Sequence, residues 1–289
     1  SLNRAKEAIK DGSFDDEVTP VSYSNDKGEF TVIHDDQPFK ADLNKIPKLK
    51  PAFDKNGTVT AANSSSISDG AAAVIIMSNE EAEKREIKKL VSYPENYEKR
   101  SNKKWPLKLF LHGIGERGNN LEQLKLHGIP KIVDSNKDFP FITVSPQCPL
   151  ELDWRENKIQ DKVIRMLEKF IENNNVDKER IYITGLSMGG YGTWSILSKR
   201  PKLFAAAIPI CGGGKTSDAL KLKEIPIWTF HGEDDDVIPV SETIDMVEAI
   251  NNINGNIKFT MYSNTKHDSW TETYNNKNIY SWLLSHIRN

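Results

Sequence analysis

The sequence predicts an α/β protein, because apolar segments of strand length alternate with helical patterns from about residue 90 onward. The residues before that point lack this alternation and form a long stretch that is polar and rich in turn-forming residues. We therefore expect a mostly parallel central sheet with helices on both faces, preceded by an irregular N-terminal extension.

Apolar segments of the C-terminal part are expected to form the strands of this sheet, at residues 107–111, 141–144, 181–184, 204–210 and 225–230. Between the second and third of these strands, apolar residues at helical spacing predict an amphipathic helix, made by Ile159, Val163, Leu167, Phe170 and Ile171. A last helix is predicted from the stripe Ile279, Trp282, Leu283 and Ile287.

The N-terminal part supports few structural predictions. Leu2, Ala5 and Ile9 fit a short helix, and Phe30–Ile33 is a short apolar run within the polar stretch Asp11–Asp69. An irregular stretch of this length is uncommon in a compact domain. It is followed by Gly70–Ser78, an apolar run with the length of a buried strand.

Composition excludes several functional classes. The 289 residues include 39 basic and 41 acidic side chains, a net charge of −2, which argues against a nucleic-acid or anionic-membrane partner. No apolar run approaches the ~20 residues that a membrane span needs. Cys148 and Cys211 are too few for a disulfide framework, and no Cys/His cluster has zinc spacing. The first ten residues are charged and do not resemble a signal peptide.

The strongest chemical signal is the pentapeptide Gly185-Leu186-Ser187-Met188-Gly189. A predicted strand precedes it and a helical segment follows at residues 190–198, which is the context of a nucleophile elbow. In such an elbow the glycines permit a sharp turn, and the helix N-terminus below the serine favours developing negative charge. Ser187 is therefore the candidate nucleophile.

A serine hydroxyl needs a base, and in this arrangement the chain order is serine, acid, histidine. Of the six histidines, only His267 follows both the serine and a candidate acid while lying in a loop before the last helix. His112 and His231 each precede a glycine at a strand end and are interpreted as structural. His267 is therefore the candidate base.

The acid is expected after the next-to-last strand, where Glu233, Asp234, Asp235 and Asp236 stand in a row. Most of these carboxylates must be merely solvated, and physical reasoning alone does not choose between Asp235 and Asp236. The acid holds the imidazole in the correct tautomer and stabilises the imidazolium.

An oxyanion hole needs two preorganised N–H groups, each typically worth about 2.7–4 kcal/mol in the transition state. Met188, directly after the nucleophile, is expected to supply one. Ile114, in the loop 112–118 after the predicted strand 107–111, is expected to supply the second N–H group.

The same loop contains a competing pattern, because Gly113, Gly115 and Gly118 form Gly-x-Gly-x-x-Gly after a strand. The residues that follow, Asn119–Gln123, are not an immediate apolar helix, and a dinucleotide site would leave the elbow unexplained. Gly212–Gly214 lacks the spacing of a phosphate loop and is interpreted as a turn. No metal or organic cofactor is predicted.

From about Val91 onward, the chain shares several motifs with one enzyme family: Pro94–Tyr97, His112–Gly118, Pro146–Pro149, Gly185–Trp194, Cys211–Gly214 and His267–Trp270. In these motifs it resembles the bacterial esterase and predicted-peptidase branch of the α/β-hydrolases, which includes carboxylesterases and feruloyl- or acetylxylan-esterase relatives. The resemblance implies an α/β-hydrolase fold. It favours Asp235 as the acid, through the spacing to Ile238-Pro239. It also implies that Trp154 and Trp270 line the substrate pocket, although a role as core aromatics remains open.

Residues 1–90 resemble a different family, the thiolases (acetyl-CoA acetyltransferases). The matching segments, in order, are Ser1–Ala5, Leu49–Phe53, Gly57–Ala61 and Ser68–Ala73. Thiolase chemistry needs two cysteines, and no cysteine precedes Cys148. We therefore interpret residues 1–90 as a fragment of a thiolase, not an independent catalytic domain, joined by gene fusion or by cloning to a catalytic domain at residues 91–289.

Together these features predict a serine carboxylesterase that hydrolyses small esters through an acyl-serine intermediate. A peptidase or amidase with the same triad, or a catalytically dead fusion or binding protein, is the alternative. The expected partner is a small-molecule ester, and the oligomeric state is not predicted. The compartment is not predicted either, because the thiolase-like segment replaces the hydrolase's own N-terminus. We further hypothesise that Ala71–Ser78 pairs antiparallel with Ile87–Tyr93 as a substitute first strand.

Overall fold

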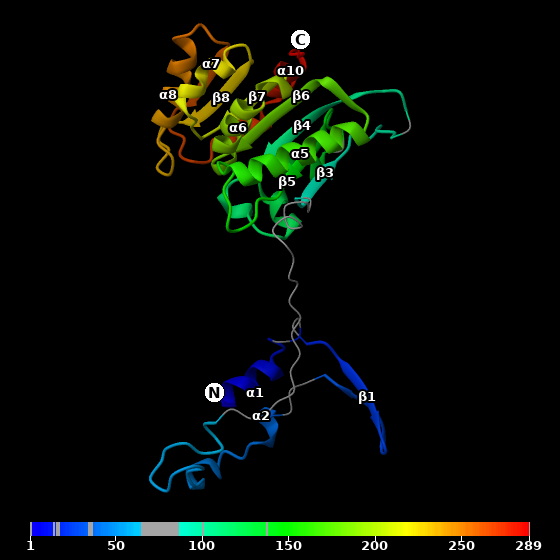
Figure 1. The fold of residues 1–289 in the computed structure, drawn as a ribbon, viewed down its shortest axis with the longest axis vertical. Helices are drawn as coiled ribbons and strands as arrows, with labels where there is room; N and C mark the ends of the chain where they lie inside the picture. The colour runs from blue at the N-terminus through cyan, green and yellow to red at the C-terminus, as the bar shows by residue number, and fades with distance from the viewer. Residues whose placement is uncertain are drawn as a thin grey trace. The chain divides into compact units, whose positions relative to one another are not determined.

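The computed structural model describes residues 2–13, 15, 18–33, 37–64, 87–99, 101–136 and 138–288. The chain divides into two compact units, Ser1–Ile76 and Met77–Asn289 (Figure 1). The division into a thiolase-like part at 1–90 and a catalytic part at 91–289 remains a prediction.

The N-terminal unit contains little regular structure. Its elements are α1 (Leu2–Lys10), β1 (Val21–Asn25), β2 (Gly28–Val32), α2 (Gln37–Lys40) and a 3-10 turn at Ile46–Lys48. The two strands form an antiparallel hairpin in which the rings of Tyr23 and Phe30 stack 5.6 Å apart. The sequence analysis noted the apolar run Phe30–Ile33, which overlaps the second strand, but predicted no strand in this part of the chain. Gly28, at φ 121°, permits the turn between the two strands.

The second unit is built on a seven-stranded sheet in the order β3-β5-β4-β6-β7-β8-β9. Its strands are β3 (Lys89–Ser92), β4 (Trp105–Leu111), β5 (Ile142–Pro146), β6 (Val176–Leu186), β7 (Ala206–Ile210), β8 (Ile227–Gly232) and β9 (Ile257–Tyr262). Strand β3 pairs antiparallel with β5, and every other pairing in this sheet is parallel. The predicted mostly parallel sheet is confirmed.

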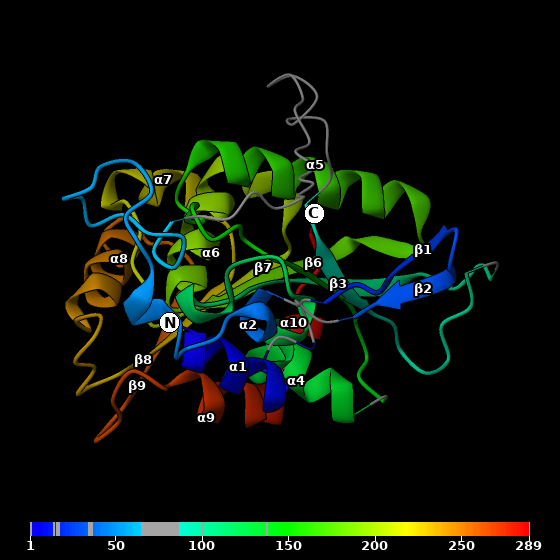
Figure 2. The ribbon, with the colours of Figure 1, turned by 90° about the horizontal axis from the view of Figure 1, so that it is seen from below.

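Helices cover both faces of this sheet (Figure 2). Those on one face are α5 (Asn157–Asn173), α6 (Met188–Lys199), α7 (Ala219–Leu222) and α8 (Ser241–Asn251), and their apolar side chains join one buried core. Those on the other face are α4 (Gly128–Ser135), α9 (Trp270–Asn275) and α10 (Lys277–Leu284), which pack into a second core. The predicted layers, with helices on both faces, are confirmed.

The two predicted helical stripes have different outcomes. All five apolar residues of the α5 stripe are buried. Helix α10 buries Ile279 and Leu283 but ends at Leu284, so Ile287 lies beyond it and is 46% exposed. Ser285 caps this end of the helix: its backbone N–H donates to carbonyls of the last turn, and its hydroxyl donates to the Trp282 carbonyl at 2.7 Å.

Strand β3 forms an edge of the sheet, and Ile87, just before it, packs into the core. The hypothesised partner strand Ala71–Ser78 lies outside the described residues. None of the helices in the described part of the chain is long and apolar enough to cross a membrane.

Removal of residues 1–70 is expected to leave a soluble protein with unchanged thermal unfolding of the C-terminal unit. The reason is that both apolar cores described above are built from residues after position 86. Thermal unfolding and ester hydrolysis of the truncated protein test this expectation. A deletion that extends through Ser78 is the matched comparison: if the strand hypothesis holds, this longer deletion lowers stability or solubility, and equal behaviour of the two proteins would refute it.

Candidate active site

The topology places two loops at the same point of the sheet. After β4 the chain continues to β5 on one side, and it later returns to β6 on the other side of β4. Loops that leave the carboxyl ends of such strands diverge and form a crevice, which is where ligands bind in open α/β sheets. Residues 112–118 follow β4 and Ser187 follows β6, so the two predicted halves of the site lie at this switch point.

Ser187 adopts the backbone geometry expected of an elbow. Its φ is 54° and its ψ is −118°, a sparsely populated conformation for a residue with a side chain. The turn is tight because a Cβ atom on Gly185 would lie 2.3 Å from the Gly189 carbonyl oxygen. Helix α6 begins at the next residue, so its N-terminus lies directly beneath the serine.

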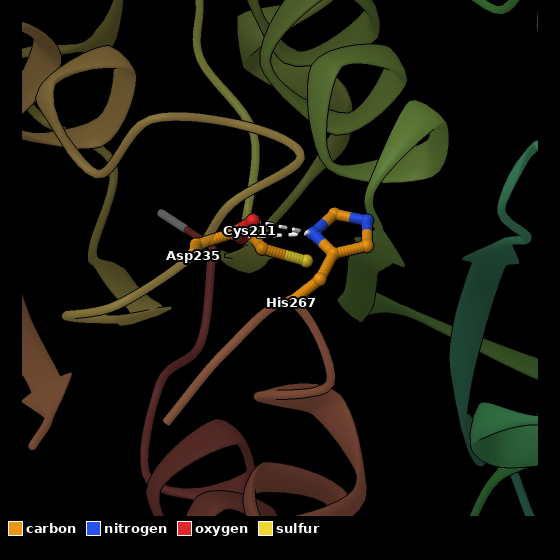
Figure 3. Close-up of side chains that lie close together, drawn as sticks. All are labelled: Cys211, Asp235 and His267. Carbon is orange, nitrogen blue, oxygen red and sulfur yellow. Dashed lines mark hydrogen bonds and ion pairs between the residues drawn. The ribbon is translucent and has the colours of Figure 1, made fainter. Parts of the chain in front are cut away.

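The side chains of the three predicted residues form one hydrogen-bonded row. Ser187 Oγ lies 2.9 Å from His267 Nε2, and His267 Nδ1 lies 2.8 Å from Asp235 Oδ2 and 3.0 Å from Asp235 Oδ1. A carboxylate only accepts, so the Nδ1–H of a neutral His267 donates to Asp235 and leaves Nε2 free to accept the serine proton. Figure 3 shows the imidazole directed at the carboxylate.

Asp235 is held as an anion by several donors. Its Oδ1 accepts from the N–H groups of Val237 and Ile238, each at 2.9 Å. Burial would raise the pKa of this carboxyl, but the bonds from His267, Ile238 and Val237 keep it below its usual value. Asp236, the other open choice, instead accepts from exposed Lys266 at 2.8 Å. The structure therefore brings Asp235, and not Asp236, to His267.

The two predicted oxyanion donors are both available. Across the described parts of the chain, the N–H groups of Ile114 and Met188 donate to no other protein group. Ile114 begins a short 3-10 turn, Ile114–Glu116, and is 59% exposed. Both groups are therefore free to donate to a substrate oxygen.

Hydrogen bonds with buried side chains hold the loop that carries Ile114 in place. His112 Nε2 accepts from the Cys148 N–H at 2.9 Å, so its Nδ1 carries the proton and donates to the Gly113 carbonyl. Burial lowers the pKa of His112 to about 4, which keeps this ring neutral near pH 7. Gln147 Nε2 donates to the carbonyls of Glu116 and Asn120 at 2.9 and 2.8 Å. The predicted structural role of His112 is thus to fix this loop.

Trp154 requires a correction, since the resemblance placed it in the substrate pocket. Its side chain is fully buried, and its indole N–H donates to the His112 carbonyl at 3.0 Å. A Cβ atom on Gly192 would lie 2.4 Å from Trp154 Cβ, so the tryptophan is wedged against α6. Trp154 supports the oxyanion loop and is not accessible to a substrate.

Trp270 lies beside the reacting groups. Its ring makes an edge contact with His267 at 5.1 Å and with His127 at 6.1 Å. Its indole nitrogen is buried without a hydrogen-bond partner among the described residues. Trp270 is therefore placed to border a substrate at His267, and its role as a binding residue remains a proposal.

Cys211 lies beneath the row, and its thiol, Asp235 and His267 have ligand-type atoms within 4.8 Å of one another (Figure 3). The Cys211 Sγ accepts from the Ser187 N–H at 3.3 Å, and burial raises the pKa of the thiol to about 12. A thiol with this pKa is a poor metal ligand near pH 7, and His267 and Asp235 already bond each other. We therefore assign the cluster to the serine site.

One residue of the site was missed. His231 was interpreted as structural, yet its Nε2 lies 3.0 Å from Asp235 Oδ2. The available signal was its position at the end of β8, four residues before Asp235, which allows the loop to fold back on the strand.

Comparisons with known proteins agree with the fold of the C-terminal unit. Residues 147–280 match the dienelactone hydrolase family. The crystal structure of a thermostable esterase is 35% identical, with a TM-score of 0.61, and the match covers 69% of this chain and 59% of that one. The C-terminal unit has the α/β-hydrolase fold. A Pyrococcus horikoshii acylaminoacyl peptidase, 17% identical with a TM-score of 0.53 over 70% of this chain and 39% of its own, shares the fold. Together, the family match and the similar esterase structure support a serine hydrolase.

The N-terminal part matches a second family. Residues 1–80 match the N-terminal domain of thiolase. The acetyl-CoA acetyltransferase of Yarrowia lipolytica is 46% identical over 96 residues, which are 32% of this chain and 24% of that protein. That of Shinella zoogloeoides is 48% identical over 91 residues, 31% of this chain and 23% of the relative. The chain thus spans about a quarter of these relatives, and the predicted thiolase-like fragment is confirmed.

Proposed function

We propose that the hydrolase unit is a carboxylesterase that cleaves small esters through an acyl-serine intermediate, with Ser187, His267 and Asp235 as its triad. The observation that carries this proposal is the row of hydrogen bonds from Ser187 Oγ through His267 to Asp235. The free N–H groups of Met188 and Ile114 support the same chemistry, since acyl transfer needs donors for a developing oxyanion.

In the first half-reaction, His267 Nε2 takes the proton of Ser187 Oγ as this oxygen attacks the ester carbonyl carbon. The carbonyl oxygen becomes an oxyanion that accepts from Met188 and Ile114. Asp235 stabilises the imidazolium without taking its proton. The tetrahedral intermediate then collapses, the bond to the alkoxy oxygen breaks, and His267 donates its proton to the leaving alcohol.

In the second half-reaction, His267 Nε2 takes a proton from water, and the resulting hydroxide attacks the acyl carbon. Collapse of the second intermediate breaks the bond to Ser187 Oγ, which regains its proton from His267. The carboxylic acid leaves, and no redox partner is needed.

The test compares p-nitrophenyl acetate with the matching p-nitroanilide and labels the protein with an active-site serine phosphonate. An esterase hydrolyses the ester, much more slowly the anilide, and is labelled stoichiometrically at Ser187. A preference for the anilide would indicate a peptidase or amidase, and absence of labelling would indicate a dead enzyme. Either result overturns the proposal.

Short acyl chains are expected to be preferred. The segments that connect the described strands at the active-site edge carry no inserted lid that could cover a long acyl chain. In a series of p-nitrophenyl esters from acetate to palmitate, we therefore expect kcat/KM to be highest between acetyl and butyryl. A maximum at long fatty-acyl esters contradicts this expectation.

A further inference from the structure

Asp235 is bonded by two histidines and not by one. Its Oδ2 lies 2.8 Å from His267 Nδ1 and 3.0 Å from His231 Nε2. The side chains of Asp235 and His231 are both fully buried. A second buried histidine therefore contacts the triad acid, in addition to the row formed by Ser187, His267 and Asp235.

The protonation of His231 at Nε2 follows from its neighbours. This nitrogen faces Asp235 Oδ2 at 3.0 Å and the Ile238 carbonyl oxygen at 2.9 Å. An ionised carboxylate and a carbonyl can only accept hydrogen bonds. His231 Nε2 must therefore carry a proton and donate it toward Asp235.

The other nitrogen of His231 is matched to a donor. His231 Nδ1 lies 2.8 Å from Thr243 Oγ1 on α8, and that hydroxyl is also 3.0 Å from the Gly212 carbonyl. The Gly212 carbonyl already accepts from the Trp194 indole N–H at 3.1 Å. The Thr243 hydroxyl has one proton, which it can donate to the Gly212 carbonyl or to His231 Nδ1. In a neutral His231 that is protonated at Nε2, Nδ1 can only accept, so donation from Thr243 satisfies this ring. Burial lowers the pKa of His231 and favours this neutral form.

We infer that His231 is a positioning residue of the proposed esterase, set by Thr243 to donate from Nε2 to Asp235 and so to hold the carboxylate that orients His267. The chain of bonds runs from Thr243 on α8, through His231 on β8, to Asp235 in the loop between them. This inference rests on the proposed function.

Other titratable groups around Asp235 do not duplicate this effect near neutral pH. Cys211, after β7, and Tyr191, on α6, both have a pKa raised to about 12 by burial and are neutral. Glu242, on α8, interacts with Tyr191, and Asp236 is bonded to Lys266. The histidines are therefore the groups that govern the charge balance at Asp235.

Loss of the His231 donor has two expected consequences. Asp235 is less firmly oriented, so kcat falls while KM changes little. The carboxylate also becomes a stronger partner for a charged His267, because one competing donor is gone. The imidazolium is then favoured. The acid limb, which is the low-pH part of the curve of kcat/KM against pH, therefore moves to higher pH.

The experiment compares His231→Leu with His231→Gln, since Gln retains an N–H donor near the position of Nε2. Activity is normalised to phosphonate-titrated sites, so that misfolded protein is not counted. We expect His231→Leu to lower kcat roughly tenfold or more, the scale seen when outer hydrogen-bond partners of metal-binding residues are removed, and to shift the acid limb to higher pH. His231→Gln is expected to recover most of kcat and the original limb.

Thr243→Val and Thr243→Ser form a second pair that leaves the histidine in place, in case the Leu variant does not fold. Valine keeps the shape but removes the donor to His231 Nδ1, and we expect a smaller loss of kcat with the same direction of limb shift. Thr243→Ser keeps the hydroxyl, and we expect it to restore both kcat and the position of the acid limb. The inference is overturned if Thr243→Val and His231→Leu both keep the kcat per titrated site of the unmodified protein. It is also overturned if kcat falls but the acid limb of the pH profile does not move. Absence of ester hydrolysis in the unmodified protein would instead overturn the proposed function.

Discussion

Ser187→Ala is expected to lower kcat for p-nitrophenyl acetate by a factor on the order of 10⁵–10⁶ while the protein stays folded. The substitution removes the oxygen that forms the acyl intermediate. Among the described residues, the Ser187 hydroxyl makes a hydrogen bond to His267 and to no other group. The residual rate then reflects binding and the oxyanion donors alone. Steady-state kinetics and thermal unfolding of the same preparation provide the two measurements.

His267→Ala is expected to cause a loss of similar size, because the nucleophile and its base act as a unit and their losses do not add. Ser195→Ala is the matched control, since this half-buried serine lies on the same helix α6 two turns after the nucleophile. A Ser187→Ala or His267→Ala protein that keeps more than a trace of activity rules out the proposed triad, and an equal loss in Ser195→Ala would mean that damage to α6 explains the effect.

The features that were predictable from sequence are those set by local pattern. Helix α5 could be predicted because its buried residues recur at helical spacing. The elbow could be predicted because Gly185 and Gly189 are required where backbone atoms approach too closely for a side chain. The candidate nucleophile Ser187 followed from the elbow motif, and the candidate base His267 followed from its position after both the serine and an acid.

The features that could not be predicted depend on tertiary contacts. Physical reasoning on the row of acids at 233–236 did not distinguish Asp235 from Asp236, and only the family resemblance favoured Asp235. In the structure, the N–H groups of Val237 and Ile238 both donate to the Asp235 carboxylate. The role of His231 could not be assigned because it depends on the hydrogen bond between His231 Nδ1 and the Thr243 hydroxyl of α8, which only the tertiary structure brings together. Trp154 was misplaced because a buried and a pocket-lining tryptophan look alike in sequence.

The N-terminal unit shows the limit of pattern analysis most clearly. Several of its large apolar side chains are exposed, among them Val21, Tyr23, Phe30 and Val32 of the hairpin and Phe53, which is 88% exposed. A matched segment that spans about a quarter of the acetyltransferases lacks most of the chain against which such residues would pack.

Gly189→Ala is expected to disrupt the elbow more severely than any other single methyl group added in this loop region. A Cβ atom at this position would lie 2.0 Å from the Leu111 carbonyl oxygen and 2.7 Å from that of His112. Both are backbone atoms at the root of the oxyanion loop, so neither can rotate away. The methyl group must push α6 from β4, which separates Ser187 and Met188 from the donor at Ile114. We expect a loss of about 3 kcal/mol or more in the free energy of unfolding, at the upper end of overpacking effects, together with loss of ester hydrolysis.

Gly115→Ala provides the control for this prediction, because it adds the same methyl group to the oxyanion loop itself. No atom lies within 4 Å of a Cβ at this position, and Gly115 is not among the residues with positive φ. The free energy of unfolding should therefore stay within about 0.5 kcal/mol of the unmodified protein, as for other unstrained surface changes. Urea unfolding of both variants, followed by activity at the same protein concentration, separates the two positions. If Gly189→Ala unfolds at the same urea concentration as Gly115→Ala, the close approach of α6 to β4 is not what shapes the elbow.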